Sequence, residues 1–183
     1  MRKWSLALVL VSAFSLPRLA HAGAVSEQFE PLQVTSFVGG EVSQMRLMSG
    51  NSNYVASGVT TGGVAGFRLG PIGLGLLAQQ TSAQDAAGGP LDLDKLYGEL
   101  ALISQYHKLT TQVSLDFGYA YLVSPQDTTR GFGGKFGLSL DYYPISVLSI
   151  GAGGAFDGQV FPLAQDVIVG LGGTFVARIG LHL

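Results

Sequence analysis

Few residues in this chain could support acyl transfer or hydrolysis. A serine nucleophile needs a base such as histidine within hydrogen-bond reach, and the sequence holds three histidines and no cysteine. His21 lies near the N-terminus, His107 stands beside Lys108 between two alternating segments, and His182 is next to last. No His-x-Ser pair marks a catalytic site. We therefore expect no catalytic residue, and we interpret His107 as a solvated turn residue and His182 as an inward-facing or terminal one.

Metal and cofactor motifs give no clearer signal. Asp85, Asp92 and Asp94 lie close together, but their spacing does not match the alternating ligands of a calcium-binding loop. The glycine-rich stretch 151–154 has no surrounding strand, loop and helix unit that would bind a dinucleotide. We predict no metal and no cofactor.

The elements that would position any site are strands with one apolar and one polar face. From Leu109 to Val123 the odd-numbered residues are mainly apolar and the even-numbered ones mainly polar or small, and a similar division recurs from Phe132 to Tyr142. This period of two is typical of a β-strand between two different environments. Repeated around a closed sheet, it predicts a barrel that presents its apolar face to lipid.

The whole chain can be divided into segments of this kind joined by alternately tight and long connections. The expected fold is all-β, an eight-stranded antiparallel up-and-down transmembrane barrel with short periplasmic turns and longer extracellular loops. The expected strands are Gln33–Arg46, Gly58–Leu69, Gly73–Gln80, Lys95–Tyr106, Leu109–Val123, Gly131–Tyr143, Val147–Val160 and Asp166–Leu183. The expected long connections are Leu47–Ser57, Thr81–Asp94, Ser124–Arg130 and Phe161–Gln165.

The N-terminus has the pattern of an export signal. Arg2 and Lys3 precede an apolar run at 6–16, and Ala20-His21-Ala22 supplies small residues for cleavage. The run is about a dozen residues long, whereas a membrane-spanning helix needs roughly 20. We predict a cleaved signal peptide at 1–22 and one outer-membrane β-barrel domain at 23–183.

Charge and composition exclude several classes of protein. The chain has 10 Lys and Arg against 12 Asp and Glu, and three of the basic residues, Arg2, Lys3 and Arg18, belong to the predicted signal peptide. The acidic balance of the remainder argues against nucleic-acid binding. The absence of cysteine excludes disulfides and thiolate redox chemistry.

Charged residues recur on the polar face of the expected strands. The interior of an eight-stranded barrel is just wide enough for side chains to fill it, so we expect these residues to satisfy one another across the lumen. A functional alternative is a narrow polar path in which Lys135 and Arg178 pair with Glu99, Asp116 or Glu41 and at times release them. The predicted lumen network is Glu41, Arg68, Glu99, Asp116, Lys135, Asp141, Asp157 and Arg178, with His182 on the same face.

The segment Tyr142-Tyr143-Pro144 followed by 148–153 is similar to the OmpA-like family of small outer-membrane barrels. The resemblance covers nearly all of the chain after the signal peptide and rests mainly on pattern. It implies a location in the cell outer membrane, contact with outer-membrane lipid and lipopolysaccharide, and a final strand recognised by the barrel insertion machinery. Ile179, Leu181 and Leu183 keep the apolar alternation of that strand, but the terminal aromatic residue of the family is missing.

Three functions agree with this pattern. The first is an integral outer-membrane barrel, not an enzyme, with a structural or surface-interaction role. The second is a narrow passive pore for small solutes. The third is a soluble periplasmic lipocalin-like binding barrel, whose apolar face would point inward around a ligand. The sequence does not identify a ligand for the loops.

Overall fold

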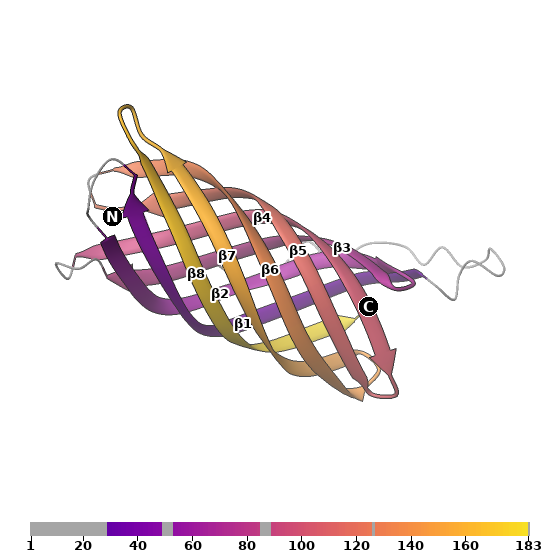
Figure 1. The fold of residues 1–183 in the computed structure, drawn as a ribbon. Helices are drawn as coiled ribbons and strands as arrows, with labels where there is room; N and C mark the ends of the chain where they lie inside the picture. Colours follow the sequence, from indigo (N-terminus) through magenta and orange to yellow (C-terminus); the bar gives the residue numbers. More distant parts are fainter. Residues whose placement is uncertain (1–28, 49–52, 85–88, 126, 183) are drawn as a thin grey trace.

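A computed structural model describes residues 29–48, 53–84, 89–125 and 127–182 of the chain. Within these ranges the backbone forms eight antiparallel strands that close into one barrel in chain order (Figure 1). The strands are β1 (Phe29–Leu47), β2 (Asn53–Leu69), β3 (Ile72–Gln84), β4 (Pro90–Tyr106), β5 (Leu109–Val123), β6 (Thr128–Ile145), β7 (Leu148–Pro162) and β8 (Val167–His182). The predicted fold class is confirmed.

The register of the strands defines how the barrel closes. Starting from Val169 on β8 and following paired positions through every strand returns to β8 at Ile179, a shift of ten residues. Such a stagger requires strands that are tilted against the barrel axis, and Figure 1 shows this oblique course. No helix in the described ranges is long and apolar enough to span a membrane.

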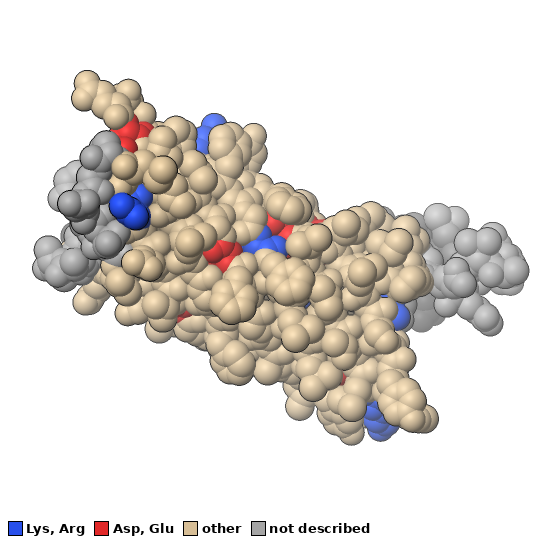
Figure 2. Space-filling model, viewed as in Figure 1, with Lys and Arg blue, Asp and Glu red and all other residues tan. Residues whose placement is uncertain are grey.

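The two faces of each strand meet different environments. On β5, Leu115 and Phe117 are exposed on the outside, whereas Ser114 and Asp116 are buried inside. Exposed leucine, valine and phenylalanine side chains recur on all eight strands, and Figure 2 shows a mostly uncharged side with charged atoms towards its ends and in one small central group. An apolar exterior around a polar interior is suited to lipid. The lipocalin-like alternative is therefore wrong, because it requires the opposite arrangement.

All eight expected strands are present, and β5 has the expected bounds. The expected long connections are wrong in large part, because pairing continues beyond the apolar belt. Ser57 pairs with Gln84, and Gln84 pairs with Pro90, all within segments expected to be loops. Polar residues can continue an antiparallel hairpin because the backbone hydrogen bonds do not depend on side-chain polarity. Positions 49–52 and 85–88 of these connections and the predicted signal peptide at 1–22 lie outside the described residues.

Candidate functional site

Four charged residues form one row of paired positions across β4, β5, β6 and β7. Glu99 pairs with Asp116, Asp116 with Lys135, and Lys135 with Asp157. All four lie on the inward face, since their outward neighbours such as Leu100 are exposed. The lumen therefore holds acidic and basic groups at adjacent positions rather than a single sign of charge.

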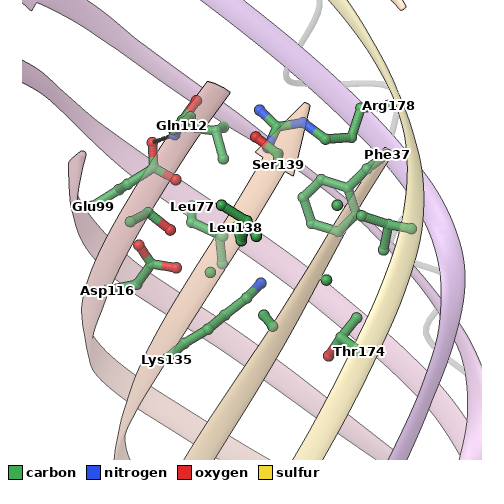
Figure 3. Close-up of a pocket in the computed structure, with 17 residues that line it drawn as sticks. Phe37, Leu77, Glu99, Gln112, Asp116, Lys135, Leu138, Ser139, Thr174 and Arg178 are labelled. Atoms are coloured by element: carbon green, nitrogen blue, oxygen red, sulfur yellow. Dashed lines mark hydrogen bonds between the residues drawn. The ribbon is translucent and has the colours of Figure 1, made fainter. Parts of the chain in front are cut away.

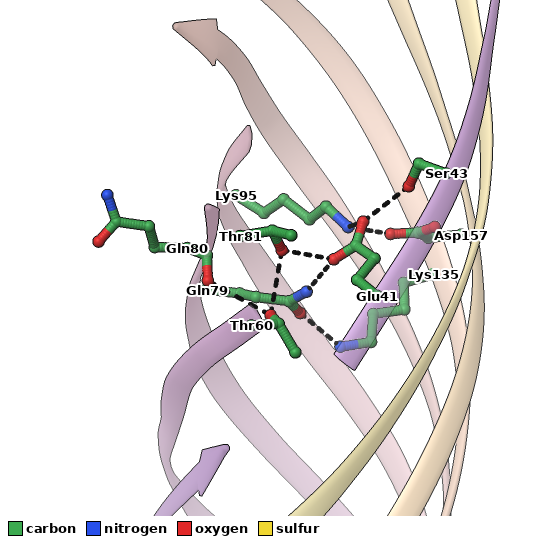
Figure 4. Close-up of polar contacts among 9 residues, drawn as sticks. All are labelled: Glu41, Ser43, Thr60, Gln79, Gln80, Thr81, Lys95, Lys135 and Asp157. Atoms are coloured by element: carbon green, nitrogen blue, oxygen red, sulfur yellow. Dashed lines mark hydrogen bonds and ion pairs between the residues drawn. The ribbon is translucent and has the colours of Figure 1, made fainter. Parts of the chain in front are cut away.

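Lys95 is the centre of a buried ion cluster next to this row (Figure 4). Its ammonium group contacts Glu41 Oε1 at 2.6 Å and also pairs with the carboxylate of Asp157. The three side chains are at most 1% exposed. Because β1, β4 and β7 are not neighbours in the sheet, this cluster crosses the lumen and joins separate parts of its wall.

The Glu41 carboxylate is held by neutral donors as well. Ser43 donates to Oε1 at 2.9 Å, and Thr81 and Gln79 donate to Oε2 at 2.6 and 2.7 Å. Gln79 also accepts a hydrogen bond of 2.8 Å from Lys135, so its amide connects the ion cluster to the charged row. A buried carboxylate with this many donors is stabilised against the cost of its desolvation.

The part of the lumen nearer the short turns is less tightly filled. A cavity of about 40 Å³ is lined by Glu99, Asp116, Lys135 and Arg178 among other residues (Figure 3). Gln112 donates to Glu99 at 3.0 Å, and Arg178 pairs with Asp141 at 3.5 Å. The cavity has room for a few water molecules. It does not form an open channel, because the ion cluster of Lys95 lies between it and the long-connection end of the barrel.

An apolar layer fills the lumen at the long-connection end. Met45, Leu93, Ala120 and Phe161 are buried together, and Leu122 and Ile168 pack against them. Phe161 is completely inaccessible. The lumen is thus closed by two successive layers, the ion cluster of Lys95 and this apolar layer.

The structure brings seven of the eight predicted network residues into the lumen, but with different partners from those expected. Arg178 pairs with Asp141, and Lys135 donates to Gln79, whereas pairing with Glu99, Asp116 or Glu41 was the hypothesis. Arg68 lies apart from the network: at the short-turn end it donates to the Gly70 carbonyl at 2.6 Å and to Gln105 at 3.2 Å.

Lys95, at the centre of the ion cluster, is absent from the network predicted from the sequence. It has the same phase along β4 as Glu99, and this four-residue spacing was a signal that could have assigned it to the lumen. The preceding stretch Thr81–Asp94 was expected to be a loop, so Lys95 was placed at the first residue of the expected strand Lys95–Tyr106. Thr81 was missed for the same reason, because it began the expected connection Thr81–Asp94. Gln79 lay inside the expected strand Gly73–Gln80 but carries no charge.

The sequence matches no protein-family model and no curated protein. The structure is similar to that of Neisserial surface protein A, with a TM-score of 0.63 over 85% of this chain and 99% of that protein, at 11% sequence identity. The fold is that of an outer-membrane barrel.

Two further outer-membrane barrels align more loosely. The N-terminal barrel domain of Pseudomonas aeruginosa OprF has a TM-score of 0.40 at 19% identity, covering 76% of this chain and 96% of that domain. The outer-membrane protease OmpT of Escherichia coli has a TM-score of 0.42 at 8% identity, covering 83% and 96%. Neither alignment bears on the function of this barrel.

A serine and a histidine do meet in this barrel, although no sequence motif indicated it. Ser149 Oγ lies 2.9 Å from His182 Nε2, because Ser149 pairs in register with Gly180, two residues before the histidine. Ser149 is only 2% exposed and belongs to the inward face. A hydroxyl enclosed in this way cannot reach a substrate carbonyl, so the pair fits a role in packing the end of the lumen.

Proposed function

We propose that this protein is an integral barrel of the cell outer membrane with a structural or surface-interaction role, and that its lumen does not conduct. The exposed apolar belt on every strand supports insertion in lipid. The predicted signal peptide at 1–22 supports export, with the barrel domain beginning at Gly23. Outer-membrane lipid and lipopolysaccharide would surround the belt, and the barrel insertion machinery would assemble it.

The observation that carries the non-conducting role is the double closure of the lumen. A solute would have to displace the Lys95 ammonium from two buried carboxylates and then pass Phe161 in the apolar layer. The passive pore would need a continuous wet path, and breaking a buried ion pair is costly. A closed barrel leaves its outer surface as the part available for interactions.

Membrane insertion can be tested by gel mobility. Washed outer membranes are dissolved in SDS and run with and without boiling. A closed barrel that resists SDS migrates differently before and after heating, and we expect this shift. A protein recovered in the soluble periplasmic fraction, with no shift, would contradict the proposal.

Conductance in planar bilayers tests the closed lumen. We expect the purified protein to show no steady channel current. A matched variant that carries Lys95→Ala and Phe161→Ala removes a side chain from both closing layers, and we expect it to conduct. Steady current through the unmodified protein would instead support the passive pore.

A further inference from the structure

A polar cleft lies at the short-turn end of the barrel, outside the lumen network. It has a volume of about 430 Å³ and lies between the turn His107-Lys108 and the turn that joins β6 to β7. Its lining includes Gln105, His107, Lys108, Tyr143, Ile145 and His182. No aspartate or glutamate is among the described residues that line it.

The cleft is held in shape by contacts between the two turns. The Tyr143 backbone N–H donates to the Lys108 carbonyl at 2.8 Å, and the Lys108 ammonium approaches the Pro144 carbonyl at 3.4 Å. The rings of Tyr143 and His182 lie 4.7 Å apart. His107 has a positive φ of 52° at the tip of its turn. The position of Lys108 is thus defined by backbone contacts across the cleft.

The chemistry of this cleft suits an anion. Lys108 carries a positive charge, and the His107 imidazole and the Gln105 amide add N–H groups that can donate hydrogen bonds. His182 lines the cleft with its ring, while its Nε2 contacts Ser149. Lysine binds phosphate as a point charge, and charge-assisted hydrogen bonds to phosphate oxygens are strong. Basic pockets of membrane proteins bind phospholipid headgroups by the same means.

We propose that this cleft binds the phosphate group of a phospholipid in the periplasmic leaflet. The inference rests on the proposed orientation, in which the short turns face the periplasm. The apolar surface beside the cations favours a phospholipid over a free phosphate ion as the ligand. Tyr106, Ile145 and Val147 are 74%, 57% and 48% exposed at this end of the barrel. A cation next to exposed apolar side chains matches a ligand with an anionic head and acyl chains.

The test uses the full protein in maltoside micelles, which contain no phosphate. Three short-chain probes are titrated: dihexanoyl phosphatidylglycerol, dihexanoylglycerol and inorganic phosphate. Binding is followed by NMR signals of the His107 and His182 rings. We expect saturable shifts with phosphatidylglycerol and at least tenfold weaker binding when His107→Ala and Lys108→Ala are combined. Arg130→Ala, which removes an exposed cation at the long-connection end, is the matched control and should leave the binding unchanged.

Each other outcome overturns the proposal. Equal saturation by inorganic phosphate would show a free-anion site rather than a lipid site. Equal shifts with dihexanoylglycerol would show an apolar contact without phosphate recognition. If phosphatidylglycerol caused no saturable shift, or if Arg130→Ala weakened its binding as much as the His107→Ala and Lys108→Ala pair, the cleft would not be a binding site. A heat-dependent gel shift for every variant checks that each barrel is folded, and the result in micelles does not depend on conductance or localisation.

Discussion

Lys95 and Glu41 are in contact at 2.6 Å although β4 and β1 are separated by two intervening strands. The same ammonium group reaches Asp157 on β7. One side chain therefore connects three strands that share no backbone hydrogen bonds. This cross-lumen connection holds the wall together in the middle of the barrel, next to the apolar layer of Met45, Leu93, Ala120 and Phe161.

Replacing Lys95 with methionine should destabilise the barrel strongly. The change keeps much of the side-chain volume but leaves Glu41 and Asp157 buried without their cation. Removing one partner of a buried ion pair costs about 3–5 kcal/mol, and we expect a loss of this size in the free energy of unfolding. The fraction of folded protein on unheated gels after urea treatment measures it.

The control for Lys95 is Lys108→Met, which removes an exposed lysine at a turn and should change stability by less than about 0.5 kcal/mol. A variant that also carries Glu41→Gln and Asp157→Asn should regain much of the lost stability, because no unpaired charge remains in the lumen. Equal stability of the Lys95 and Lys108 variants would show that the ion cluster does not stabilise the fold.

The faces of the strands could be predicted from the sequence, but the contacts between them could not. A period of two assigns Asp116 and Lys135 to the inward face. The period does not predict which residue of the next strand is its paired neighbour, because a register shift of two residues keeps every side chain on the same face. The row from Glu99 to Asp157 therefore became visible only with the strand pairing.

Polarity misled the prediction where strands extend beyond the apolar belt. The residues from Thr81 to Asp94 include three aspartates together with Gly88, Gly89 and Pro90, which is typical of a loop. The described parts of this stretch continue β3 and β4 instead. This error also concealed Lys95, which lies five residues inside β4 and not at its start.

An arginine at position 100 should distinguish a lipid-facing surface from a water-facing one. Leu100 is 49% exposed, and its paired neighbours Leu74 and Leu115 are exposed leucines. In a bilayer, Leu100→Arg should cost about 2–4 kcal/mol, whereas exposed sites of soluble proteins change by about 0.5 kcal/mol or less. Urea unfolding in liposomes measures the difference. Thr128→Arg, at an exposed position beyond the belt, should be nearly neutral, and equal effects would contradict lipid contact.

Gly133 leaves space for the ring of Tyr97 inside the lumen. Tyr97 is completely buried, and a methyl group added at Gly133 would collide with its hydroxyl group. Gly133→Ala should therefore destabilise the barrel by about 1–3 kcal/mol, as overpacking does. Tyr97→Phe in the same chain should restore part of this loss by removing the colliding atom. Gly154→Ala is the control, since the nearest atom to its new methyl group lies at 3.6 Å. If Gly133→Ala destabilised the barrel just as much in the presence of Tyr97→Phe, a collision with the Tyr97 hydroxyl group would not be the cause.

Tyr119 and Phe132 should stabilise each other at the long-connection end of the belt. They are paired positions on β5 and β6 with ring centroids 5.2 Å apart, and the Arg130 guanidinium lies 5.2 Å from the Tyr119 ring. Aromatic pairs contribute about 0.5–1.5 kcal/mol beyond their buried area. A double-mutant cycle with Tyr119→Ala and Phe132→Ala, measured by urea unfolding in liposomes, should show coupling of that size. A cycle that combines Phe132→Ala with Leu74→Ala on β3 should be additive within about 0.5 kcal/mol. Additivity of the aromatic pair as well would mean that each ring contacts lipid independently.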